Sequence, residues 1–186
     1  MIVVVIVAAV LVVVGVGALL SYNRFVRQRQ LVDNSWSNVD TELKRRYDLI
    51  PNLVATVEGY AAHERATLDA VVRARRNAVD SAGSAAAQAA DENTLVDALR
   101  QLLALRESYP DLKASTQFLD LQLQLTTTED RIQAARRFYN SNVRDYNTRV
   151  ETLPSRLIAA FGHFDKRDYF QVEPAIRDAG APEIAG

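Results

Sequence analysis

The stretch FLDLQLQLTTTEDRIQAARRFYNSNVRDYNTRVETL, residues 118–153, carries apolar side chains at alternating steps of three and four residues. Such steps place side chains on one face of an α-helix. The stripe follows a heptad pattern, typical of a coiled coil, with one four-residue insertion near Tyr139 that unwinds a supercoil without breaking the helix. We therefore expect one helix from about Ala114 to Leu153, closed by Pro154. A helix this long needs partners to cover its stripe.

Three further amphipathic stretches precede this helix. The first has apolar side chains at Val32, Trp36, Val39, Leu43, Tyr47 and Ile50. Pro51 should end or kink it, because proline removes a backbone donor and clashes with the preceding turn. The second stretch runs from about Asn52 to Val79. The third carries Leu95, Leu99, Leu102 and Leu105 and should stop before Pro110.

Residues 80–92, which are small and polar around Gly83, are interpreted as a helix–helix connection. Four amphipathic helices with short connections predict an all-α fold, namely an antiparallel four-helix bundle with long helices. We assign the bundle to residues 21–163. Residues 164–186 are expected to form a partly ordered tail.

Residues 1–20, MIVVVIVAAVLVVVGVGALL, contain no charged side chain. Ile2 to Leu20 is long enough to cross a bilayer as a helix. A secretory signal peptide is the alternative, with Val16-Gly17-Ala18 as a weak cleavage site, but a basic n-region is missing. The sequence favours an uncleaved single transmembrane helix that binds membrane lipid through residues 2–20.

The orientation of the anchor is predicted from its flanks. Arg24, Arg27 and Arg29 follow the apolar segment before any acidic residue. The positive-inside rule then places the small N-terminus outside and residues 21–186 in the cytoplasm of a single-pass cell-membrane protein. Since no proline or glycine lies between Gly17 and Pro51, we expect the membrane helix to continue directly into the first bundle helix.

Composition leaves little for catalysis. The 186 residues include 22 Lys and Arg against 23 Asp and Glu, a net charge of −1 that argues against nucleic acid as a partner. There is no cysteine, and the two histidines are His63 and His163. His63 and Glu64 begin like an HExxH zinc motif, but Thr67 stands where the second histidine is needed. We expect no catalytic, cofactor-binding or metal site.

Several polar or aromatic positions still require an interpretation. Lys44, Arg45 and Arg46 are successive positions of one helix, so their side chains point in different directions around it. Arg46 should therefore lie near the apolar stripe and pair with an acid on another helix. Glu129 and Asp130 are interpreted as solvated or interhelical salt-bridge positions. Trp36 is expected in the core because of its place in the stripe.

Four stretches carry a family resemblance: SWSNVDTELKRRYDLIPNLVATVEGYAAH at 35–63, SYPDLKAS at 108–115, TEDRIQAARRFYNSNVRDYN at 128–147 and LPSRLIAAFG at 153–162. They resemble the LemA family of membrane-anchored bacterial proteins, over nearly the whole chain from Arg24 to Tyr169. The resemblance implies a single-pass membrane protein with a helical bundle and no established enzymatic activity, associated with membrane proteases and envelope processes. The family commonly closes with an aromatic-containing tail, whereas this chain ends in EIAG.

These observations predict a membrane-anchored, non-catalytic helical adaptor or scaffold of the bacterial cell envelope. Its expected partner is another membrane or envelope protein, with a membrane protease as one candidate. Two alternatives remain open from the sequence. One is a bundle that binds a small ligand in an internal pocket, and the other is a self-associating structural homo-oligomer.

Overall fold

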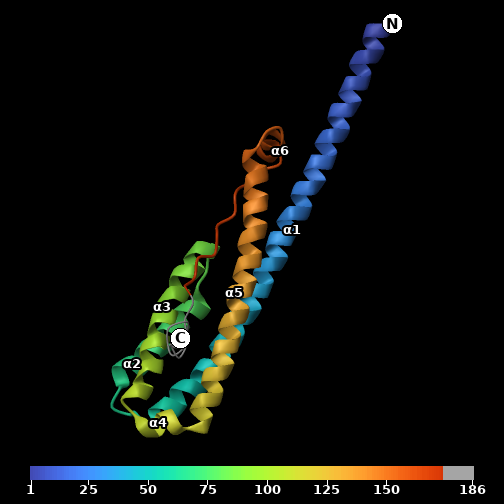
Figure 1. Ribbon diagram of the computed structural model, residues 1–186. Coiled ribbons are helices and arrows are strands. Elements are labelled where there is room, and N and C mark those ends of the chain that lie inside the picture. The colour runs from blue at the N-terminus through green and yellow to red at the C-terminus, as the bar shows by residue number, and fades with distance from the viewer. Residues whose placement is uncertain (174–186) are drawn as a thin grey trace, which may run out of the picture.

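A computed structural model describes residues 1–173 of the chain, and this part is helical without any strand. Figure 1 shows the helices, whose bounds are α1 (Ile2–Glu58), α2 (Arg65–Asp80), α3 (Ala85–Ala104), the 3₁₀ turn η1 (Leu105–Glu107), α4 (Pro110–Ala114), α5 (Thr116–Glu151) and α6 (Ser155–Phe161). The expected all-α fold is confirmed.

Two long helices and a shorter pair build the molecule. α5 runs antiparallel along the middle and C-terminal parts of α1, while α2 and α3 form an antiparallel hairpin beside the end that lies farthest from the N-terminus (Figure 1). All four contribute fully buried side chains to one core, among them Val39, Val71, Leu99 and Ile132. The N-terminal part of α1 projects beyond the other helices (Figure 1).

The projecting part of α1 is the apolar segment. Its side chains are exposed almost throughout, and it is long and apolar enough to cross a membrane. α1 continues without interruption from Ile2 into the packed helical domain, as the absence of breakers after Gly17 predicts. The apolar segment and the first bundle helix are therefore one rod.

Pro51 does not end this helix as one of the two predicted outcomes required, because α1 passes through Pro51 and ends at Glu58. Proline leaves the carbonyl oxygen four residues earlier, that of Tyr47, without its helical donor. The Nε of Arg75 on α2 supplies this hydrogen bond at 2.7 Å. The expected helix over Asn52–Val79 is consequently divided: its first part belongs to α1, residues 59–64 form a turn, and the remainder is α2.

The later boundaries agree better with the sequence. Pro110 is the first residue of α4, so the expected boundary there is confirmed. The connection expected over 80–92 is shorter, because α3 already begins at Ala85, where the hydroxyl oxygen of Ser84 accepts a hydrogen bond from the amide of Ala87. α6, which follows Pro154, was not anticipated as a separate helix.

After α6 the chain turns back along α5 as an extended segment, residues 164–173. Its side chains Phe164, Phe170 and Val172 are buried. Trp36, expected in the core, is only partly buried and packs against Tyr139 and Phe170, with ring centroids 5.2 and 5.3 Å away. The rest of the expected tail, residues 174–186, lies outside the described residues.

Candidate functional site

A buried ionic cluster lies where α1, α3 and α5 meet. The guanidinium of Arg46 is fully buried, donates to Glu129 Oε2 at 3.0 Å and pairs with Glu92. Arg46 thus pairs with an acid on another helix, as expected, and of the two alternatives for Glu129 the structure shows the interhelical salt bridge. Glu92 was missed because the sequence placed it in a connection, and only the early start of α3 brings it inward.

Neutral side chains complete the cluster. The hydroxyl of Tyr47 donates to Glu92, and the Nε2 of Gln88 donates to the same carboxylate at 3.0 Å. Gln133 donates to Glu129 at 2.9 Å. Burial, followed by the charge of Glu92, raises the pKa of Tyr47 above its ordinary value. Both carboxylates are bonded and almost unexposed, so the cluster joins α1, α3 and α5 inside the core.

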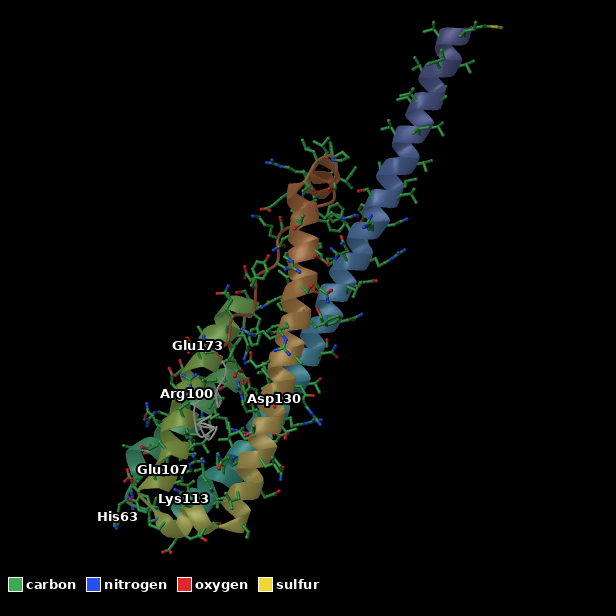
Figure 2. All side chains as sticks on the ribbon, viewed as in Figure 1. His63, Arg100, Glu107, Lys113, Asp130 and Glu173 are labelled. Carbon is green, nitrogen blue, oxygen red and sulfur yellow. The ribbon has the colours of Figure 1, made fainter. Side chains whose placement is uncertain are left out.

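The residues considered for metal chemistry lie apart. His63 is exposed in the turn after α1, at the end of the molecule far from the apolar segment, and Asp130 is exposed on α5 (Figure 2). His163 is exposed after α6. Within residues 1–173, no three His, Asp or Glu side chains are grouped to hold a metal ion.

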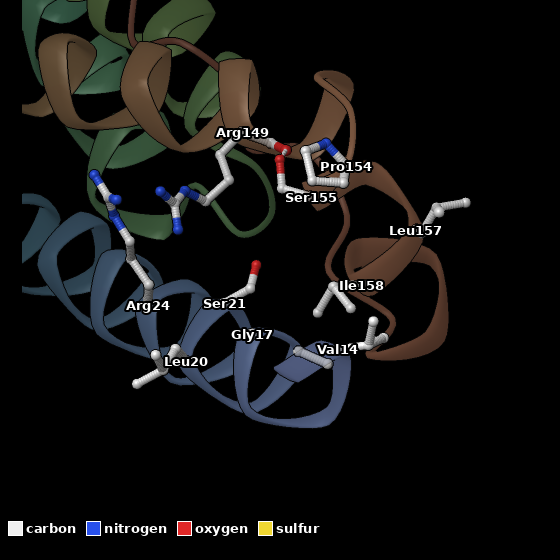
Figure 3. A pocket seen from close by; sticks show the side chains of 11 residues that line it. Val14, Gly17, Leu20, Ser21, Arg24, Arg149, Pro154, Ser155, Leu157 and Ile158 are labelled. Atoms are coloured by element: carbon white, nitrogen blue, oxygen red, sulfur yellow. Dashed lines mark hydrogen bonds between the residues drawn. The ribbon is translucent and has the colours of Figure 1, made fainter. Parts of the chain in front are cut away.

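A groove lies at the opposite end, beside the apolar segment. It is bounded by α1, by the last turn of α5 and by the loop and first turns of α6, and has a volume of about 630 Å³ (Figure 3). One part of the lining is apolar and the other is polar or charged. The lining residues are Val14, Gly17, Ala18, Leu20, Ser21, Arg24, Arg149, Pro154, Ser155, Leu157 and Ile158.

The charged end of the groove contains two guanidinium groups, those of Arg24 and Arg149 (Figure 3). Neither has a carboxylate oxygen within 4.0 Å in the described part of the chain. Burial and the positive charge of Arg24 lower the pKa of Arg149. Arg149 also lies over the ring of Phe25, 5.6 Å from its centroid. Among residues 1–173, the groove thus holds two neighbouring cations without a carboxylate counter-ion.

Aromatic packing fixes α6 against α1. The ring of Phe164 stacks on Phe25 at 4.9 Å and meets Tyr22 edge-on at 5.3 Å. Gly162 allows this, because a Cβ at that position would lie 2.7 Å from Cδ2 of Phe164. Sequence reasoning missed α6 and the groove, although the pattern LPSRLIAAFG carried an apolar signal.

α6 leaves apolar side chains uncovered near the apolar segment. Leu153, Leu157 and Phe161 are 74%, 59% and 87% exposed. Leu157 and Phe161 are one helical turn apart and lie on the same face of α6. Exposed apolar side chains at neighbouring positions are common on surfaces that contact protein or lipid.

Comparison with known proteins places the chain among bacterial relatives. A sequence model described as "LemA family" matches residues 35–185. Magnetosome protein MamQ 2 of Paramagnetospirillum magneticum is 26% identical over 182 residues, covering 84% of this chain and 67% of the relative. Magnetosome protein MamQ of Magnetospirillum gryphiswaldense is 25% identical with the same coverage. Protein LemA of Metamycoplasma hominis is 26% identical over 138 residues, covering 74% of this chain and 63% of the relative.

Proposed function

The chain belongs to the LemA family, and we propose that it is a membrane-anchored, non-catalytic adaptor of the cell envelope. In this function, residues 2–20 are inserted in the bilayer and the helical domain holds a second membrane or envelope protein close to the lipid surface. A membrane protease is one candidate for that protein.

The continuity of α1 is the observation that carries this proposal. One helix contains both the exposed apolar segment and eleven of the buried residues of the domain, from Phe25 to Val57. A flexible linker would let the domain sample a large volume, whereas a continuous helix restricts its distance and angle to the bilayer. Restricted placement suits a protein that meets partners in the same membrane.

The uncovered surface of α6 supports the same placement. α6 packs beside the part of α1 that includes Val14 and Ser21, so Leu157 and Phe161 lie near the level where the apolar segment ends. Side chains of this kind are stabilised at the boundary between headgroups and acyl chains. Arg24, Arg27 and Arg29 flank the apolar segment on the side of the helical domain. The positive-inside rule therefore favours a cytoplasmic location for that domain.

Two features support an adaptor over the alternatives. In the described part of the chain, Arg46, Tyr47, Glu92, Glu129 and Gln133 form hydrogen bonds with one another in the interior, which supports a packed core over a ligand pocket. The apolar stripe of α5, from Phe118 to Tyr146, is buried against the same chain. That stripe is therefore occupied before any second copy could pair with it.

Position-specific photo-crosslinking in intact cells tests the proposal. A photoreactive residue at Arg27, beside the bilayer, should capture a membrane protein. The same group at His63 should not, because the helix places it roughly 45 Å farther from the bilayer. Both positions are exposed.

A full-length control separates anchoring from folding. Val7→Arg combined with Val10→Arg puts two charges into the apolar segment. Each arginine raises the free energy of membrane insertion by about 2.5–3.5 kcal/mol. Both side chains are more than half exposed, so the bundle should still fold. Capture from Arg27 should be lost in this variant. Equal capture from positions 27 and 63 would contradict the proposal. Capture from position 27 that persists in the variant with Val7→Arg and Val10→Arg would also contradict it.

A further inference from the structure

The groove beside the apolar segment combines an apolar wall with two arginines that form no ion pair with any of the described residues. We propose that it binds one anionic phospholipid, with the phosphate between Arg24 and Arg149 and an acyl chain along the wall from Val14 to Leu20. This inference rests on the proposed insertion of residues 2–20 in a bilayer.

The spacing of the α1 residues fits a lipid that lies along the helix. Val14, Gly17, Ser21 and Arg24 follow one another at steps of three and four residues, so they share one face of α1. Val14 and Arg24 are about 15 Å apart along the axis, the distance from a headgroup into the acyl-chain region. Arg24 stands four residues beyond Leu20, at the headgroup level.

The shape of the wall provides room for a chain. Gly17 has no atom within 4 Å of the position that a Cβ would take. Ile158 of α6 points toward α1 from the other side of this space (Figure 3), and Leu157 also lines the groove. The hydroxyl of Ser21 points into the groove between the apolar wall and the arginines (Figure 3).

The electrostatics at the end of the groove that contains Arg24 and Arg149 favour a bound anion. In the described residues neither guanidinium has a carboxylate partner, and the nearby Asp145 is 3.9 Å from Arg144 instead. The hydroxyl of Ser155 donates to carbonyl oxygens of the chain and does not neutralise Arg149. Two neighbouring guanidinium groups, an exposed one on Arg24 and a partly buried one on Arg149, are stabilised by a bound phosphate, which accepts charge-assisted hydrogen bonds.

Other occupants would satisfy only half of the groove. A free phosphate would pair with the arginines and leave the apolar wall uncovered. An apolar helix of another protein would cover the wall and leave two cations unpaired. An anionic phospholipid has both parts at the required spacing.

The first test measures lipid selection by the full-length chain. The protein is reconstituted in vesicles of equal amounts of phosphatidylglycerol and phosphatidylcholine, and the lipid retained after mild detergent extraction is counted by native mass spectrometry. Phosphatidylglycerol should be retained preferentially. Arg24→Gln with Arg149→Gln should lower that preference by about fivefold for each guanidinium removed. The matched control is Arg27→Gln with Arg137→Gln, which removes the same amount of charge outside the groove. This control should keep the preference for phosphatidylglycerol.

The second test fills the apolar wall without changing charge. Gly17→Leu places a side chain inside the groove and should reduce lipid retention. Gly15→Leu is its matched control, because Gly15 also has open space for a Cβ but does not line the groove. Equal loss in both variants would overturn the proposed chain position.

Flotation with the vesicles distinguishes this inference from the proposed function. If the protein floats with the vesicles but retains no excess of phosphatidylglycerol, the lipid site alone is overturned. The same conclusion follows if the variant with Arg24→Gln and Arg149→Gln retains phosphatidylglycerol as strongly as the wild type. Failure to float overturns the anchor and the site with it. Inorganic phosphate that displaces the retained phosphatidylglycerol completely would show an anion site without a chain site, which also overturns the inference.

Discussion

The Nε of Arg75 on α2 donates a hydrogen bond of 2.7 Å to the main-chain carbonyl oxygen of Tyr47 on α1. Residue 51, which would donate to that oxygen in a regular helix, is a proline. A side chain from another helix therefore replaces the missing backbone donor. The same contact attaches α2 to α1, beside the buried cluster of Arg46, Glu92 and Glu129.

This relationship predicts a coupling between Arg75 and Pro51. Arg75→Ala should lower the free energy of unfolding by about 1–3 kcal/mol, because the Tyr47 oxygen loses its donor. In a Pro51→Ala background the amide of residue 51 supplies the bond, and the loss on Arg75→Ala should shrink. Denaturant unfolding of the four proteins measures this coupling. Arg76→Ala, at an exposed neighbouring position, is the control. Additive effects of Arg75→Ala and Pro51→Ala on the free energy of unfolding would contradict the prediction.

The extended segment after α6 should depend on asparagine side chains that pair with its backbone. Asn140 donates to the oxygen of Phe170 and accepts from its amide, both at 2.9 Å. Asn147 makes the same pair of bonds with Arg167, at 2.8 and 2.9 Å. Asn140→Ala with Asn147→Ala should release residues 164–173, seen as faster amide hydrogen exchange there. Exchange in α1 should change little. Unchanged protection of Phe170 would contradict this prediction.

Alkaline pH should destabilise the protein in a defined range. Burial raises the pKa of Tyr139 to about 12, and its hydroxyl donates to the oxygen of Asp168 at 2.9 Å. The unfolded chain loses this proton near pH 10, about two pH units earlier. Stability should thus be constant below about pH 10 and fall from there to about pH 12, by up to about 1.4 kcal/mol per pH unit for this group. Tyr139→Phe should reduce the slope, whereas Tyr60→Phe, at an exposed position, should not.

Gly162 should be required for the packing of α6. A Cβ there would overlap the ring of Phe164 and move it from Phe25. Gly162→Ala should lower the free energy of unfolding by about 1–3 kcal/mol, as overpacking does. Gly59→Ala is the matched control, because the closest contact of its added Cβ is an ordinary 3.4 Å. Thermal unfolding compares the two, and equal melting temperatures would show that Phe164 adapts without cost.

The continuity of α1 should persist in a bilayer. The chain contains no cysteine, so spin labels at Leu19→Cys and Leu31→Cys report one distance. Both side chains are exposed. Twelve helical steps predict a separation of about 18 Å with a narrow distribution. A broad distribution would reveal a joint between the apolar segment and the bundle, and the restricted placement of the domain would have to be abandoned.

Features that depend on local spacing follow from the sequence alone. Apolar steps of three and four residues identify the long helices, and an uncharged run of residues 2–20 identifies the apolar segment. The same reasoning placed a boundary at Pro110 and directed Arg46 toward an acid on another helix. These inferences succeed because periodicity and missing donors act within one or two helical turns.

Contacts between residues that are distant in the chain become visible only in the folded structure. Pro51 and Pro110 are the same residue type, yet α1 continues through the first because Arg75 reaches the freed carbonyl oxygen of Tyr47. Glu92 enters the core because α3 begins early and faces Arg46. The groove exists because α6 folds back on α1 and Phe164 holds it there. Such contacts join residues far apart in the chain, and no local pattern encodes their distance.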